Sequence, residues 1–179
     1  MLYQWYELGH AVVRPARIAA DASRMLLNSP FNPFNHTTAA RHAAAACEVF
    51  ERTTRRYDKP GFDIASTLVD GVRVPVRERP VLRAPFCRIL HFERELPAGV
   101  TRNDPKLLIV APMSGHFASL LRGTVETFLP DHEVYITDWE DARDVPRAEG
   151  LFDLDDYIDY MRATFTWFGG DVHVFSACQ

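Results

Sequence analysis

The segment from residue 106 to 178 alternates short apolar runs with stretches of helical periodicity. Lys106–Met113 (KLLIVAPM) is almost continuously apolar, which is typical of a strand buried on both faces. His132–Trp139 and Asp171–Cys178 are further strand-like runs, and a helix-periodic segment separates each run from the next. Strands joined by helices are normally parallel neighbours with right-handed crossovers. The sequence therefore predicts an open α/β sheet.

The two segments between these runs have clear helix signals. SGHFASLLRGTVETFL, Ser114–Leu129, carries apolar residues at helical spacing. In the second segment Asp153 is a good N-cap, and the pair Gly169–Gly170 is typical of a helix end. We therefore expect one helix to begin after the strand at Met113 and another to begin after Asp153.

Residues 66–95 predict strands that precede this alternation. Asp70-Gly71 lies between β-favouring flanks and predicts a tight hairpin, and Phe86–Glu95 is a further strand candidate. Pro75 lacks a backbone N–H, so we expect it at an edge strand or at the start of a strand. The α/β sheet should thus begin with an antiparallel hairpin.

The first 60 residues predict a helical segment. Leu2–Leu27 is helical in pattern, with Pro15 expected to kink or split it, and Ser29–Thr38 is a loop rich in proline and asparagine. Thr37 or Thr38 can cap a second, alanine-rich helix. The sequence therefore predicts two parts, a helical segment over 1–60 and an α/β domain over 66–179.

Composition excludes several classes of function. The net charge of −4 argues against wholesale nucleic-acid binding, which needs a basic surface. No apolar run approaches the roughly 20 residues of a membrane-spanning helix, and the N-terminus lacks the pattern of a secretory signal. The three cysteines, Cys47, Cys87 and Cys178, predict reduced thiols of a cytoplasmic protein. Cys87 and His91 share a strand face, but two ligands are too few to predict a metal site.

In an open α/β sheet, ligands bind at the carboxyl ends of the strands. Three such ends are informative: Pro112–His116, Thr137–Trp139 and Ser176–Gln179. Cys178 therefore lies where a reactive group is expected. The preceding element order, a hairpin, a third strand, a helix, a fourth strand, a helix and a fifth strand, matches the start of an α/β-hydrolase. In that fold the nucleophile follows the fifth strand in a tight small-x-nucleophile-x-small turn. Here Ser176 is the first small residue.

Long stretches of the chain resemble one family. LLIVAPMSGHFASLLRGTVETFLPDHEVYITDW and GGDVHVFSACQ, together with MLYQWYEL and HAAAACEVFERTTRRYDKPGF, resemble the intracellular poly(3-hydroxybutyrate) depolymerases. The resemblance covers essentially all 179 residues. It implies an α/β-hydrolase fold with Cys178 as a cysteine nucleophile. Related polyhydroxyalkanoate synthases use a G-x-C-x-G turn, and Ser176 in place of the first glycine favours a depolymerase.

The resemblance also implies the chemistry. The Cys178 thiolate would attack an ester of 3-hydroxybutyrate, giving a thioester that water or the thiol of coenzyme A cleaves, with no other cofactor and no metal. In this fold the oxyanion is bound by the backbone N–H of the residue after the nucleophile, Gln179, and by one from the loop after the third strand, Met113 or Ser114. His116 and Asp138 are weaker candidates for residues of the pocket.

The triad acid and histidine follow the nucleophile in this fold, and Gln179 is the last residue given. We therefore expect a domain truncated after its fifth core strand and inactive alone on polymer; steady ester turnover dependent on Cys178 would contradict this. The implied partner is the granule surface of the polymer. An aromatic N-terminal helix containing Trp5 can lie on such a surface; the alternative is that its rings pack against the hydrolase core. Two alternatives stay open, a polyhydroxyalkanoate synthase relative and a non-catalytic granule-associated protein.

Overall fold

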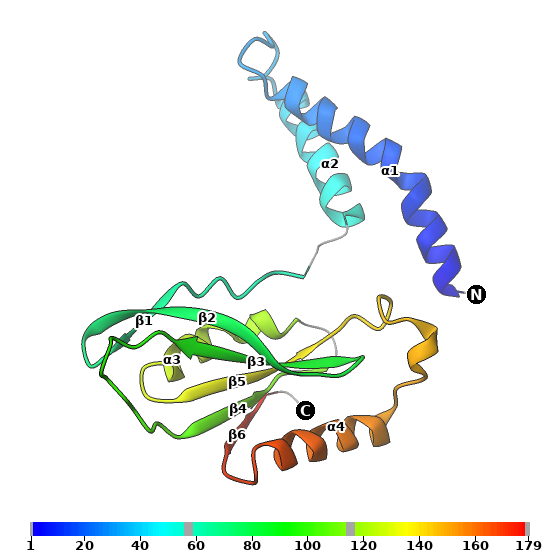
Figure 1. Ribbon diagram of the computed structural model, residues 1–179. Coiled ribbons are helices and arrows are strands. Elements are labelled where there is room, and N and C mark those ends of the chain that lie inside the picture. The colour runs from blue at the N-terminus through cyan, green and yellow to red at the C-terminus, as the bar shows by residue number, and fades with distance from the viewer. Residues whose placement is uncertain (1, 56–58, 114–116, 178–179) are drawn as a thin grey trace. The chain divides into compact units, whose positions relative to one another are not determined.

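The chain divides into two compact units, Met1–Asp58 and Lys59–Gln179. The structure is a computed structural model that describes residues 2–55, 59–113 and 117–177. The first unit is helical and the second is built on a β-sheet (Figure 1). Four of the predicted site residues lie outside the described residues: Ser114, His116, Cys178 and Gln179.

The first unit is a pair of helices, α1 (Leu2–Leu27) and α2 (Thr38–Thr54). The two are tied by Arg17, whose Nη1 donates to the carbonyl of Thr54 at 2.7 Å. Thr37 is the cap of α2, one of the two residues predicted, because its Oγ1 accepts from the N–H of Ala40 at 3.2 Å. Pro15 lies inside α1, which continues through it, so the split that the sequence allowed does not occur.

The second unit is a mixed α/β structure around a six-stranded sheet with the order β1-β2-β3-β5-β4-β6. The neighbours from β1 to β5 run antiparallel along this order, whereas β4 is parallel to both β5 and β6. The predicted parallel strands and the antiparallel start of the sheet are therefore confirmed. The strands are β1 (Ser66–Val69), β2 (Val72–Arg83), β3 (Cys87–Arg94), β4 (Lys106–Val110), β5 (Glu133–Trp139) and β6 (His173–Ser176).

The hairpin of β1 and β2 turns at Asp70 and Gly71, as predicted. Both residues have positive φ, 50° and 79°, which a two-residue type I′ turn requires. The expectation for Pro75 needs correction, because it lies inside β2, which is not an edge strand. β1 pairs with β2 only as far as Pro75, and β3 pairs with β2 from Val76 onward. The missing N–H therefore falls where β2 changes its partner.

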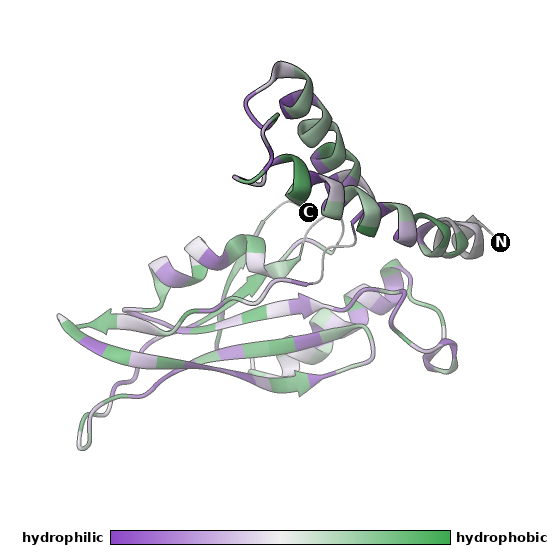
Figure 2. Ribbon diagram, turned by 90° about the horizontal axis from the view of Figure 1, so that it is seen from above, coloured by the Kyte–Doolittle hydropathy of each residue, from purple (hydrophilic) through white to green (hydrophobic). Residues whose placement is uncertain are grey.

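Helices cover both faces of the sheet at β4. On one face Leu107 and Ile109 pack in the same core as Val125 and Leu129, beside α3 (Arg122–Phe128). On the other face Leu108 and Val110 pack with residues of α4 (Leu154–Trp167) such as Met161. Hydrophobic and hydrophilic residues alternate along the long strands of the sheet, as the colours in Figure 2 show. β4 is thus buried on both sides, as its continuous apolar run predicted.

The helix predicted over 114–129 is shorter than expected. Phe117 has extended backbone, and a 3-10 turn η1 (Ala118–Leu121) precedes α3. The helix predicted after Asp153 is confirmed as α4, with Asp153 and Asp156 forming a reciprocal capping box. It ends at Gly169 and Gly170, which have positive φ of 67° and 80°. A short 3-10 turn η2 (Arg147–Glu149) lies in the loop between β5 and α4.

Candidate active site

The carboxyl ends of β4, β5 and β6 lie side by side at one edge of the sheet. Ile109 of β4 is opposite Ile136 of β5, and Val110 is opposite Ser176 of β6. After β4 the chain crosses to β5 on one side, and after β5 it returns to β6 on the other side. The direction of strand addition therefore reverses at β4. This reversal is where open α/β sheets bind ligands.

Two side chains of β5 hold the start of the loop that follows β4. Thr137 Oγ1 accepts a hydrogen bond from the N–H of Ala111 at 2.8 Å. Trp139 Nε1 donates to the carbonyl of the same residue at 3.1 Å. Both backbone groups of Ala111 are buried in these bonds and need partners. The loop that leads to Met113 therefore leaves β4 from a fixed point.

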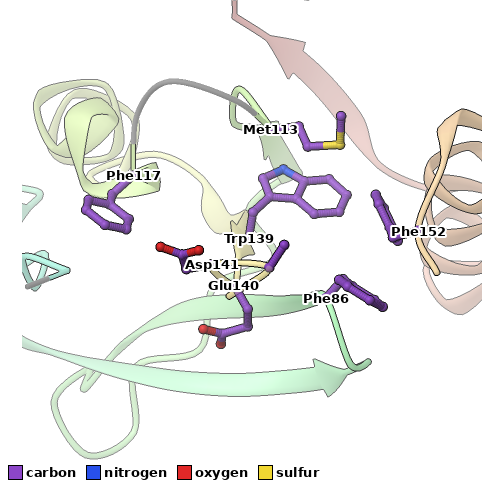
Figure 3. A pocket seen from close by; sticks show the side chains of 8 residues that line it. Phe86, Met113, Phe117, Trp139, Glu140, Asp141 and Phe152 are labelled. Atoms are coloured by element: carbon purple, nitrogen blue, oxygen red, sulfur yellow. The ribbon is translucent and has the colours of Figure 1, made fainter. Parts of the chain in front are cut away.

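A pocket of about 460 Å³ opens at this edge. Figure 3 shows Trp139 near its centre, with Phe117 on one side and Phe86 and Phe152 on the other. The residues come from segments that are distant in sequence: the turn before β3, the loop after β4, the end of β5 and the loop before α4. The described lining consists of Phe86, Met113, Phe117, Trp139, Glu140, Asp141, Ala142 and Phe152.

Aromatic packing keeps the indole of Trp139 in place. The ring stacks on Tyr157 of α4 at a centroid distance of 5.2 Å, and it meets Phe152 edge-on at 5.8 Å. Phe152 also contacts Phe86 at 4.8 Å. Aromatic pairs at these separations contribute beyond the area that they bury. The pocket wall is therefore a preformed apolar surface.

A buried ion cluster lies directly behind this wall. Asp138 is 1% exposed, and it is opposite Arg88 across the β3–β5 ladder. Arg88 Nη2 lies 2.6 Å from Asp138 Oδ2, and Lys59 Nζ lies 2.8 Å from Asp138 Oδ1. Lys59 also donates to the carbonyl of Trp139 at 3.1 Å. Glu140 completes the cluster, with Oε1 at 3.1 Å from Arg88 Nε. The cluster fixes the end of β5 that carries Trp139.

The described cysteines differ in environment. Cys87 is buried, and burial, followed by the negative charge of Asp138, raises the pKa of its thiol to about 12. Such a thiol stays protonated near neutral pH and is a poor nucleophile. Cys47 is half-buried on α2 in the other unit. Cys87 is opposite Trp139 at the carboxyl end of β5, but it is buried and is not among the described residues that line the pocket.

The predicted site residues that the structure describes occupy different positions. Met113 is exposed and lines the pocket, so its backbone lies at the edge expected for an oxyanion donor. Asp138, a predicted pocket residue, is not part of the described lining, because its carboxylate is held by Arg88 and Lys59 behind the wall. The predictions for Ser114, His116, Cys178 and Gln179 concern residues that the structure does not describe.

Sequence reasoning missed the residues that build the pocket. Trp139 was recognised as a strand end, but its neighbours Phe86 and Phe152 gave no periodic signal. Lys59 lies 80 positions before Trp139, the residue whose carbonyl it binds, and a spacing of that kind marks no motif. The sequence feature that could have indicated the pocket is Trp139, a large aromatic residue at the carboxyl end of a predicted strand.

Among residues 2–55, 59–113 and 117–177, no three His, Cys, Asp or Glu side chains lie close enough to hold a metal ion. None of the helices in that part combines the length and apolar character that crossing a bilayer requires.

The chain was compared with known proteins in three ways. No family model matches it, and neither the curated proteins nor the solved structures contain a significant match. The resemblance in sequence motifs therefore has no support from these comparisons, and the site has to be interpreted from its own geometry.

Proposed function

We propose that the unit Lys59–Gln179 is part of an α/β-hydrolase domain that cleaves ester bonds of poly(3-hydroxybutyrate) through Cys178. The site of action would be the cytoplasmic storage granule. The element order supports the fold when the short strand β1 is left out: the antiparallel pair β2 and β3, then β4, α3, β5, α4 and β6 follow one another as in the start of that fold, and β6 takes the place of its fifth strand. The parallel β4, β5 and β6 support it further, because their carboxyl ends lie side by side at the edge where residues that follow β4 and β5 line the pocket.

The observation that carries the proposal is the path of the chain at the end of β6. The N–H of Ala177 donates to the carbonyl of Val110 at 3.4 Å, so Ala177 lies beside the end of β4. Cys178 is the next residue in the chain. A nucleophile attached there starts from the edge where Ala111 and Met113 leave β4 and where the apolar pocket opens.

The proposed reaction forms and breaks one bond in each half. The thiolate of Cys178 attacks the ester carbonyl carbon, an S–C bond forms, and the C–O bond to the alcohol end of the polymer breaks as that oxygen takes up a proton. The N–H groups of Gln179 and of Met113 or Ser114 would stabilise the oxyanion, and losing one such donor costs about 10²–10³ in rate. Water then attacks the thioester carbonyl carbon, a new C–O bond forms and the S–C bond breaks, which releases the carboxylic acid and returns the thiol of Cys178. The acid and histidine of the triad follow the nucleophile in this fold, so we assign neither role to a residue of this chain.

The pocket bears on the choice of acyl acceptor. Coenzyme A carries phosphate groups, which arginine and lysine bind well. None of the described lining residues is a lysine or an arginine. This composition favours water over coenzyme A as the group that cleaves the thioester.

The first unit favours a second function, non-catalytic association with the granule surface. Several of its large apolar side chains are strongly exposed, among them Trp5 at 70%, Val12 at 69% and Phe31 at 94%. Helices with exposed aromatic and aliphatic side chains bind apolar interfaces. In the proposed enzyme the same surface would bring the hydrolase unit to its polymer.

The proposal is tested with an activated substrate, because a good leaving group lets a thiol be acylated without the rest of a triad. We expect the full chain, mixed with the p-nitrophenyl ester of 3-hydroxybutyrate, to release p-nitrophenolate in a burst of about one equivalent per chain, as acyl-enzyme formation requires. Stopped-flow absorbance measures the burst.

Two cysteine variants provide the comparison. Cys178→Ala should lower the burst rate by about 10³-fold or more, the scale seen when a nucleophile is removed. The matched variant Cys47→Ala should retain the burst, because Cys47 is in the other unit. A burst of equal rate and size in Cys178→Ala would refute the proposed nucleophile.

A further inference from the structure

The pocket beside Trp139 presents apolar walls and a carboxylate rim. Its apolar side chains, Phe86, Met113, Phe117 and Phe152 with the indole, surround the space, and the carboxylates of Glu140 and Asp141 are its charged groups (Figure 3). None of the described lining residues is cationic. The lining therefore distinguishes ligands by charge as well as by size.

Both carboxylates have cationic partners that are not among the described lining residues. Glu140 is 3.1 Å from Arg88 Nε and 3.6 Å from Lys59 Nζ. Asp141 Oδ2 accepts from Arg143 Nε at 2.8 Å. The cations that pair with Glu140 and Asp141 are therefore not part of the described pocket wall.

These charges have different consequences for three kinds of ligand. A carboxylate would lose water without gaining a cationic partner from the described lining, so its binding is disfavoured. A cation gains less than an acidic rim suggests, because the side chains of Glu140 and Asp141 are already engaged by guanidinium groups. An uncharged ester with methyl side groups loses little hydration and buries apolar area against Trp139 and Phe152.

We propose that this pocket binds an uncharged segment from the interior of the polyester chain and excludes the carboxylate end. The inference rests on the proposed ester-hydrolase function and specifies how that site would choose its bond. The volume of about 460 Å³ is within the range of roughly 300–1,000 Å³ found for sites of drug-sized ligands. It therefore has room for more than one four-carbon unit. Cleavage would then start inside the chain and not from its carboxylate end.

The test uses three trimers of 3-hydroxybutyrate that differ only at one end: the methyl ester, the free carboxylate and the choline ester. The protein is the full chain carrying Cys178→Ala, which prevents acylation. Trp5→Phe and Trp167→Phe leave Trp139 as the single fluorescent indole among the three tryptophans. Titration of its emission then reports binding at this wall.

We expect the methyl ester to shift the emission saturably and the free carboxylate to bind about tenfold more weakly at neutral pH, because the carboxylate would lose water without gaining a cationic partner. The choline ester should bind no more tightly than the methyl ester. Equal binding of the free carboxylate would overturn the inference. Tighter binding of the choline ester would overturn it as well, since the pocket would then be a site for cations.

Matched substitutions separate the pocket from general effects. Phe152→Ala should weaken the methyl ester about tenfold, because it removes a ring that contacts Trp139. Phe165→Ala, on α4 and outside the described lining, should leave affinity unchanged. If Phe152→Ala does not fold by circular dichroism, Met113→Ala replaces it, because that side chain is exposed. If Phe152→Ala and Phe165→Ala bind the methyl ester with equal affinity, the proposed site is contradicted. If the Cys178→Ala chain binds the methyl ester but the wild-type thiol is not acylated, the proposed nucleophile is refuted and the proposed binding pocket stands. Failure of one proposal can therefore be distinguished from failure of the other.

Discussion

Replacing Arg94 by alanine is expected to lower the free energy of unfolding by about 4 kcal/mol, because it breaks a buried ion cluster by removing one partner. The Arg94 side chain is 0% exposed. Its guanidinium donates to the carbonyls of Leu129 and Pro130, at 3.1 and 3.2 Å, and to the carboxylates of Asp104 and Glu133, at 2.8 and 2.6 Å. The variant would leave both carboxylates without this partner. Urea unfolding followed by circular dichroism measures the change.

At acid pH, the loss of unfolding free energy caused by Arg94→Ala should become smaller. Hydrogen bonds from Arg102 and Arg94 lower the pKa of Asp104, and hydrogen bonds from His91 and Arg94 lower the pKa of Glu133. A carboxyl group with a lowered folded pKa stabilises the protein at neutral pH, and this contribution is lost as the pH falls through that pKa. The advantage of the wild-type chain over Arg94→Ala should therefore shrink below about pH 4.

An exposed arginine provides the control for this prediction. Arg77 on β2 pairs with Glu95 at 2.6 Å, but its side chain is 69% exposed. Arg77→Ala should cost less than about 1 kcal/mol, as exposed ion pairs do. Similar losses in Arg77→Ala and Arg94→Ala would show that the buried cluster does not hold the amino ends of β4 and β5 together.

Replacing Asp138 by alanine is expected to lower the free energy of unfolding by about 3 kcal/mol. The carboxylate is almost fully buried and binds Arg88 and Lys59, which are themselves about one third and one quarter exposed. That partial exposure lets water solvate the cations left behind, so the loss is at the lower end of the range for buried pairs. Urea unfolding in the Trp5→Phe, Trp167→Phe background, where the emission comes from Trp139, measures both the stability and the integrity of the pocket wall.

Two further variants test the cause of that loss. Asp138→Asn keeps an oxygen that can accept from Arg88, so it should lose less stability than Asp138→Ala. Asp131→Ala, in the exposed loop before β5, should be near neutral. If Asp138→Ala were also near neutral, the ion cluster would not be what fixes the end of β5.

Features set by short stretches of sequence were predictable. The turn at Asp70 and Gly71 needs positive φ, which these residue types adopt most readily, and the capping box at Asp153 depends on a residue three positions away. The continuous apolar run of β4 predicted burial on both faces. Each of these signals is local, so one sequence was enough to read it.

Features set by contacts between distant residues were not predictable. Pro75 was expected at an edge strand or at the start of a strand, but the position where β2 changes partner depends on where β1 and β3 end. The pairing of Lys59 with Asp138 joins the first residue of the second unit to the end of β5. The pocket depends on Phe86 and Phe152 meeting in space. Such contacts follow from the sheet register, which residue spacing alone does not reveal.

The position of the acyl group after reaction tests the central claim most directly. The full chain is treated with the p-nitrophenyl ester of 3-hydroxybutyrate, digested at acid pH to preserve thioesters, and mapped by mass spectrometry. We expect the acyl group on the peptide that contains Cys178, with Cys87 unmodified because burial raises the pKa of its thiol to about 12. An acyl group distributed equally over Cys47 and Cys178, or absent from Cys178, would contradict the account.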